Sequence, residues 1–115
     1  MTVLDRCVHD NSRAPLANEY AQKHLDVAAA MCQALSDPAR LRLLLLLSKR
    51  EMCVSELVDY EEAKLSSISA RLQTLHAARL VTRRREAKHV FYALADEHVY
   101  NLLSNILGHA VETQN

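Results

Sequence analysis

A helix that is apolar on nearly every side must lie at the centre of whatever fold this chain adopts. Five consecutive leucines occupy positions 43–47. Asp37 and Pro38 precede them as a strong helix start, because Asp is a favoured N-cap and Pro suits the first helical position. The helix expected over residues 39–48 therefore carries leucine on most of its faces. Such a helix is stable only when other elements surround it.

The length and composition fit one small domain. The chain has 115 residues with one glycine and two prolines, which argues against long flexible linkers. Residues 1–16 are polar, so we expect an N-terminal arm followed by one domain over residues 17–115. Three cysteines, an odd number, do not suggest a disulfide framework. No apolar leader or bilayer-length run is present, so the sequence predicts a cytoplasmic protein without a membrane partner.

Helical and extended patterns alternate along the rest of the chain. Ile68, Leu72 and Leu75 recur at helical spacing and predict the buried face of one helix, while Ser55 and Asp96 are expected to cap two others. The order of the elements predicts a mainly α fold with a small β-hairpin, a winged helix-turn-helix. The expected elements are helices at 17–35, 39–48, 55–60, 65–78 and 97–112, an extended piece at 52–54, and strands at 80–84 and 89–94 joined by residues 85–88.

The second short helix and the basic hairpin predict a DNA interface. The net charge is zero, but basic residues crowd into the hairpin region. In a winged helix-turn-helix the second short helix enters the major groove, and hairpin arginines meet phosphates or the adjacent minor groove. A polar helix face or an arginine run alone is more often plain solvated surface, so the prediction depends on their combination. The expected contacts with double-stranded operator DNA are Lys64, Ser66, Ser67, Ser69, Ala70, Arg71, Gln73, Arg83, Arg84, Arg85, Lys88 and His89.

The last helix carries a ligand pair at each end, Asp96 with His98 and His109 with Glu112. Eleven residues separate the histidines, about three turns or roughly 16 Å, so one ion cannot bridge both. If two copies of the helix pack antiparallel, each end meets the opposite end of its partner, and two symmetric sites form. Two nitrogens and two carboxylates suit tetrahedral Zn(II), and Co(II) after it. As an alternative, Asp96 is only an N-cap and the others are ordinary surface residues.

A second candidate metal site combines Cys7 and His9 of the arm with Cys53 and Glu56. Thiolate ligands would favour softer ions such as Cd(II) or Pb(II) there. The alternative is that Cys53 is a small buried apolar side chain and Cys7 an unligated thiol. Cys32 lies on the apolar face predicted for its helix, where we expect it in the core.

Several strings of the chain together resemble the ArsR/SmtB family of metal-responsive bacterial repressors. They are residues 34–43, 51–57, 66–72 and 88–94, and the likeness covers roughly residues 28–112. The resemblance implies a homodimer formed through the first and last helices. It also implies that the Asp-x-His and His-x-x-Glu pairs bind metal, and that a cysteine arm can join Cys53. The chain departs from the family at Ser55, where a second cysteine or glycine is usual, and at Glu62 and Ala87, where glycine is frequent.

The sequence therefore predicts a dimeric repressor that leaves its operator on binding Zn(II) or a similar divalent metal, derepressing metal-resistance or efflux genes. The sign of the response is implied by the resemblance alone. One alternative is a thiol- or redox-sensing repressor using Cys7, Cys32 and Cys53. Another is a zinc-buffering or structural dimer without an operator, against which the basic hairpin argues. An enzyme is disfavoured, since four protein ligands would leave zinc no open position for water.

Overall fold

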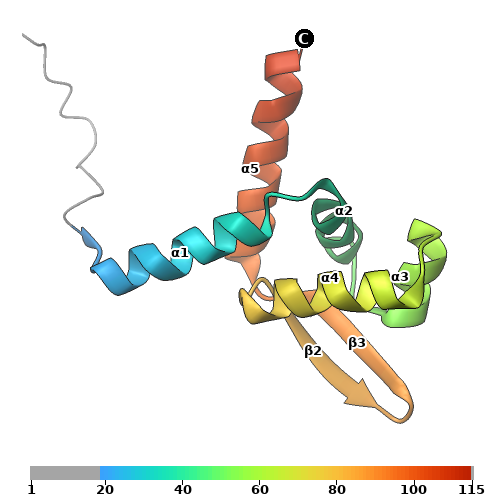
Figure 1. Cartoon of the computed structure of the whole chain (residues 1–115). Helices are drawn as coiled ribbons and strands as arrows, with labels where there is room; N and C mark the ends of the chain where they lie inside the picture. The colour runs from blue at the N-terminus through green and yellow to red at the C-terminus, as the bar shows by residue number, and fades with distance from the viewer. Residues whose placement is uncertain (1–18, 115) are drawn as a thin grey trace, which may run out of the picture.

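A computed structural model describes residues 19–114, so the predicted arm lies outside the described part. Five helices and three short strands follow in the expected order (Figure 1). The fold is the predicted winged helix-turn-helix. Its elements are α1 (Gln22–Ala34), α2 (Pro38–Leu47), β1 (Met52–Cys53), α3 (Val54–Glu61), α4 (Leu65–Ala77), β2 (Val81–Glu86), β3 (His89–Leu94) and α5 (Glu97–Gln114).

The leucine-rich helix α2 begins as predicted and forms the centre of the core. The Asp37 side chain accepts a hydrogen bond from the Arg40 amide at 3.0 Å, which satisfies one of the free amides at the helix start. One expectation was too broad, because Leu45 stays 41% exposed on the side of α2 away from the core. The fully buried side chains are Leu43, Leu44, Met52, Leu57, Ile68, Leu72, Leu75 and Leu80.

Helix α3 is capped by Cys53, and the prediction that Ser55 caps it was wrong. Cys53 is extended, with φ −84° and ψ 163°, because the strand β1 runs directly into the helix. Its amide donates to Glu56 Oε1 at 3.1 Å, as in one half of a capping box. Ser55 therefore lies inside the first turn. The helix ends at Glu61, and the next residue, Glu62, is its C-cap with a left-handed φ of 50°.

The hairpin is longer than predicted. Arg85 and Glu86, assigned to the connection, pair with Val90 and His89 and extend β2. The loop is reduced to two residues, Ala87 and Lys88, and only the first has a positive φ, 55°. Positive φ at the first loop residue alone is the type II′ pattern, where glycine is preferred. The three strands form an antiparallel sheet in the order β1-β3-β2.

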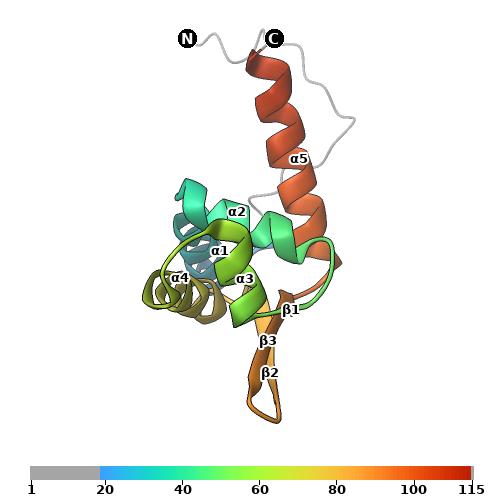
Figure 2. The ribbon, with the colours of Figure 1, turned by 90° about the vertical axis from the view of Figure 1, so that its right-hand side faces the viewer.

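Helices α1 and α5 project away from the core in different directions (Figures 1 and 2). The radius of gyration is 18.4 Å, against about 13 Å for a compact domain of 100 residues. Helix α1 starts at Gln22 rather than at 17, and Cys32 is exposed, so the prediction that it lies in the core was wrong for a single chain. The large exposed apolar side chains of the two helices are Leu25, Val27, Tyr100, Leu102, Ile106 and Val111.

Replacing Ala87 by glycine is expected to stabilise the fold by about 0.5–1 kcal/mol. The left-handed region is unfavourable for a residue with a Cβ but not for glycine, and this gain exceeds the entropy that glycine adds to the unfolded chain. Urea unfolding monitored by circular dichroism measures the change. Ala70→Gly is the control, because Ala70 is exposed in α4 and should lose about 1 kcal/mol. A loss of stability in Ala87→Gly would contradict the turn assignment.

Candidate nucleic-acid interface and metal ligands

Helix α4 presents a polar face to solvent because its apolar face is fixed in the core. Ile68, Leu72 and Leu75 are fully buried and set the rotation of the helix. The predicted DNA-contacting residues lie on the remaining faces. Lys64, Ser66, Ala70 and Gln73 are exposed, while Ser67, Ser69 and Arg71 are half-buried.

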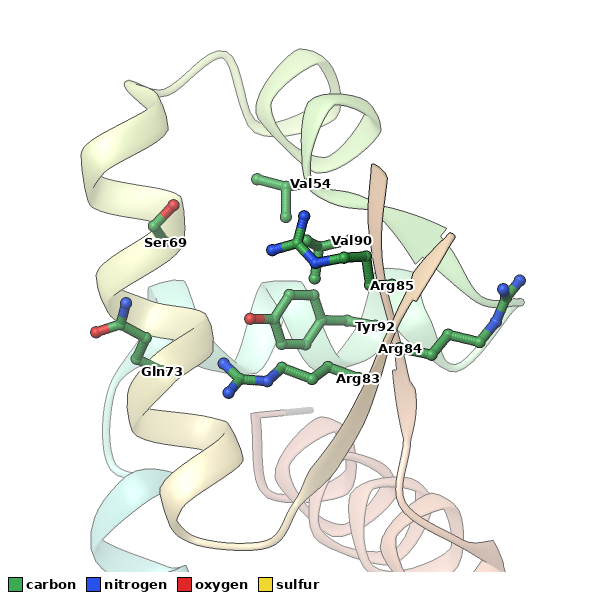
Figure 3. Close-up of a pocket in the computed structure, with 8 residues that line it drawn as sticks. All are labelled: Val54, Ser69, Gln73, Arg83, Arg84, Arg85, Val90 and Tyr92. Atoms are coloured by element: carbon green, nitrogen blue, oxygen red, sulfur yellow. The ribbon is translucent and has the colours of Figure 1, made fainter. Parts of the chain in front are cut away.

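The hairpin divides its three arginines between two faces. Side chains alternate along a strand, and Arg83 and Arg85 pair with Tyr92 and Val90 in the register. Arg83 and Arg85 point toward α4, whereas Arg84 points to the other side of the sheet (Figure 3). The three arginines are consecutive in the sequence, but they therefore lie in two different environments.

A groove of about 400 Å³ separates α4 from the hairpin. Ser69 points toward it from the helix, and the Arg83, Arg85 and Tyr92 side chains point toward it from the strands (Figure 3). Helix polar groups and two cations therefore converge on one concave surface. Its lining residues are Val54, Ser69, Gln73, Arg83, Arg84, Arg85, Val90 and Tyr92.

The Arg84 guanidinium is bound within the protein. It donates to Glu51 through Nε at 2.8 Å and Nη2 at 2.7 Å, and to Glu86 through Nη1 at 2.9 Å. It also lies 4.6 Å from the centre of the Phe91 ring. Hydrogen bonds with these carboxylates raise the pKa of Arg84, and its guanidinium lowers the pKa of Glu51. Glu51 is not predictable from the sequence as a site residue, because its partner is 33 residues away.

The last two predicted contacts lie at the tip of the hairpin. Lys88 is the second loop residue and is exposed, as is His89. The His89 ring packs obliquely on Phe91, with 6.1 Å between centroids. Both side chains are thus free to meet a partner at the tip.

The two ends of α5 each carry their predicted ligand pair on the surface. Asp96 Oδ2 lies 3.7 Å from His98 Nδ1, and the His98 side chain is 97% exposed. Asp96 is also the predicted cap, since its Oδ1 accepts from the Val99 amide at 3.1 Å. His109 and Glu112 are exposed one turn apart near the other end. Within residues 19–114 no three candidate ligands come together, so a last-helix site needs ligands from two chains.

The second candidate site is described only in part, because Cys7 and His9 lie outside residues 19–114. Cys53 is buried, with its Sγ 3.1 Å from Ser55 Oγ. The Glu56 carboxylate is bound by Arg50 Nη2 at 2.7 Å and by the Cys53 amide, and these two contacts lower the pKa of Glu56 to about 2. A metal at this place would have to compete with Arg50 for that carboxylate. Arg50 was not among the residues predicted for this site.

Among the described residues, no helix is both long enough and apolar enough to cross a bilayer. A family model described as "Bacterial regulatory protein, arsR family" matches residues 37–83, the segment from the cap of α2 into β2. This segment contains the core helix, the helix-turn-helix and the first half of β2.

Named relatives extend the likeness over most of the chain. A transcriptional repressor SmtB homolog of Synechocystis is 40% identical over 77% of this chain and 70% of that protein. The repressor SmtB of Mycobacterium tuberculosis is 36% identical over 76% of this chain and 65% of its own length, just under two thirds. A cadmium resistance regulatory protein CadC homolog of Staphylococcus aureus is 34% identical over 79% of this chain and 75% of that protein.

A solved structure supports the same fold. The solution structure of a homodimeric winged helix-turn-helix DNA-binding domain from Mycobacterium bovis, described as a possible ArsR-family regulator, superposes with a TM-score of 0.75 at 30% identity. The match covers 88% of this chain and 91% of that domain.

The capping role of Asp96 can be separated from any role as a ligand. Asp96→Ala should cost about 1 kcal/mol of stability, because the Val99 amide loses its acceptor. Asp96→Asn should cost almost nothing, since asparagine caps equally well but carries no charge. Thermal unfolding of the metal-free protein measures both variants. Equal losses in the two would contradict the cap and would indicate that the charge itself stabilises the chain.

Proposed function

The chain belongs to the ArsR family of bacterial regulatory proteins, and on that premise we propose that it is a dimeric transcriptional repressor released from operator DNA by Zn(II). One observation above all supports the proposal. Helix α5 starts on the core, where Val99 and Leu103 are buried, and extends well beyond it, with an exposed histidine–carboxylate pair at each end. Such pairs complete a four-ligand site only when a second copy is present.

The DNA interface combines base reading by α4 with phosphate binding by the hairpin. With α4 in the major groove and the hairpin at the adjacent minor groove, the phosphate ridge between the grooves must pass between the two elements. The groove beside α4 occupies that place, and Arg83 and Arg85 approach it. Guanidinium groups suit phosphate oxygens in charge and geometry. Ser69 and Arg71 of α4 are proposed to contact base edges.

The proposed dimer would cover the apolar side chains that α1 and α5 expose. Leu25 is 50% exposed, Ile106 is 44% exposed and Val111 is 62% exposed. Apolar patches that continue along two projecting helices are typical of subunit interfaces. Cys32 would then lie near the interface, so its expected burial would be recovered in the assembly. A dimer also suits a repressor that reads two half-sites.

Zinc would act by favouring one arrangement of the two subunits. An antiparallel pair of α5 helices would place Asp96 and His98 opposite the His109 and Glu112 of the partner subunit. The distance between the two α4 helices depends on the subunit arrangement, and a poor spacing weakens DNA binding. Because the coupling free energy is reciprocal, operator DNA must weaken zinc binding by the same factor. The genes expressed after the repressor leaves the operator would encode metal-resistance or efflux proteins.

We propose two further signals that would release the same DNA-binding fold from its operator. The Cys7, His9, Cys53 and Glu56 set would bind Cd(II) or Pb(II), and the CadC homolog supports a softer-metal response. Thiol modification is favoured by the exposure of Cys32. Each signal predicts release of DNA without any need for His109. The His109 variant below therefore separates both of them from the zinc response.

Replacing His109 by alanine should leave the fold and operator affinity intact while abolishing release by zinc. The side chain is exposed and makes no core contact, so its loss removes one ligand from each proposed site and little else. Fluorescence anisotropy of a labelled operator during a zinc titration measures release. His24→Ala is the control, at an exposed histidine of α1 whose Nδ1 accepts from the Ala21 amide at 3.3 Å, and it should still be released by zinc. Release of the His109 variant at wild-type zinc concentrations would refute the last-helix site.

Alanine substitutions in α4 and in the hairpin should have different effects on DNA binding. Ser69→Ala with Arg71→Ala should reduce discrimination between operator and scrambled DNA, since a base-edge contact contributes about 1–3 kcal/mol. Arg85→Ala should weaken binding to both DNAs and reduce the slope of log K against log salt by about 1. Binding isotherms at several salt concentrations measure both. Identical behaviour of the two variants would contradict this division of roles.

A further inference from the structure

The contact between Arg84 and Glu51 spans the whole width of the sheet. Arg84 belongs to β2, at one edge, and Glu51 immediately precedes β1, at the other edge. Strand β3 lies between them, and its Phe91 ring lies under the Arg84 guanidinium. The ion pair therefore ties the outer strand of the hairpin to the segment that leads into α3. Glu86, the other partner of Arg84, belongs to β2 itself.

Backbone pairing between the hairpin and the rest of the domain is short. Strand β1 pairs with β3 at only two positions, Met52 with Tyr92 and Cys53 with Phe91. The outer end of the hairpin projects from the domain as a two-stranded ribbon (Figure 2), and Val90 is its outermost side chain that packs against the core. Isolated two-stranded ribbons are weakly stable and twist readily. A bidentate bond from Arg84 to Glu51 restrains that twist where the ribbon leaves the domain.

Arg84 is poorly suited to bind a phosphate. Three of its N–H groups already donate to carboxylates, and the two carboxylates more than balance its single charge. A phosphate approaching this face would therefore meet Glu51 and Glu86 as well as the guanidinium. The sequence predicts DNA contacts for Arg83, Arg84 and Arg85 alike. In the structure, the environment of Arg84 differs from that of the other two.

We propose that Arg84 and Glu51 are positioning residues that hold the hairpin at the correct distance from α4 without touching DNA. This rests on the proposed DNA-binding function. The restraint fixes where the inner face of β2 carries Arg83 and Arg85 relative to Ser69 and Gln73 across the groove. A hairpin free to twist would present the two inner arginines in many orientations, and operator binding would pay for ordering them.

Operator binding by Glu51→Gln gives the sharpest test, because the two roles predict opposite signs. If Arg84 only positions the hairpin, Glu51→Gln weakens binding although it removes a negative charge, and Arg84→Gln weakens it without changing the salt slope. If Arg84 binds phosphate, Glu51→Gln strengthens binding and Arg84→Gln lowers the slope by about 1. Glu86→Gln is the matched control, since it removes an Arg84 partner without cutting the tie across the sheet. It should not weaken binding.

Hydrogen exchange of the free protein tests the same restraint without DNA. Amides of β2 and β3 should exchange roughly twofold or more faster in Arg84→Gln and in Glu51→Gln than in the wild type, whereas Arg85→Gln and Glu86→Gln should leave them unchanged. Unchanged exchange in the first two variants would overturn the proposal. If the wild type bound no operator, the proposed function would fail, and exchange would still decide whether the tie restrains the hairpin.

Discussion

The packing of α2 against α4 is the interaction on which the rest of the molecule depends. Leu43 and Leu44 on one helix and Ile68 and Leu72 on the other are fully buried. Burial of side chains of this size contributes about 1.5–3 kcal/mol each, far more than any exposed contact of the chain. Because this packing fixes the rotation of α4, it also decides that Ser69 and Gln73 reach the groove. The DNA-facing surface is thus what remains after the core has formed.

Local chemistry made the core and the helix starts predictable from the sequence. Asp37 and Asp96 cap as expected because a cap depends on residues three positions apart. The cap of α3 was mispredicted at Ser55, since the choice of Cys53 depends on pairing of β1 with a strand nearly 40 residues later. Strand β2 was likewise predicted to end two residues too early, at Arg84 instead of Glu86, and the reason is the same. Hairpin register is set by both strands together, and not by the turn residues alone.

In the candidate site, too, contacts between residues close in the sequence were predictable, and contacts between distant residues were not. The closeness of Asp96 to His98 follows from their spacing, whereas the bond from Arg84 to Glu51 joins residues 33 positions apart. Strand alternation alone could have separated Arg84 from its two neighbours. The exposure of Cys32 and Leu45 was not predictable, because helical periodicity predicts an apolar face without saying how much of it the chain's own core covers.

The connection between β3 and α5 gives the proposed metal response a short physical route to the DNA interface. Strand β3 ends at Leu94, the Ala95 amide donates to Leu80 at 3.0 Å, and Asp96 caps α5 immediately afterwards. A ligand held by Asp96 would therefore act on the same stretch of chain that, four residues earlier, carries Tyr92 into the groove beside α4. Since Leu80 is buried, this junction cannot bend locally without disturbing the core. A change at the start of α5 would also act on the core through Val99 and Leu103, which are buried, and in the proposed dimer it would reach α4 by this route.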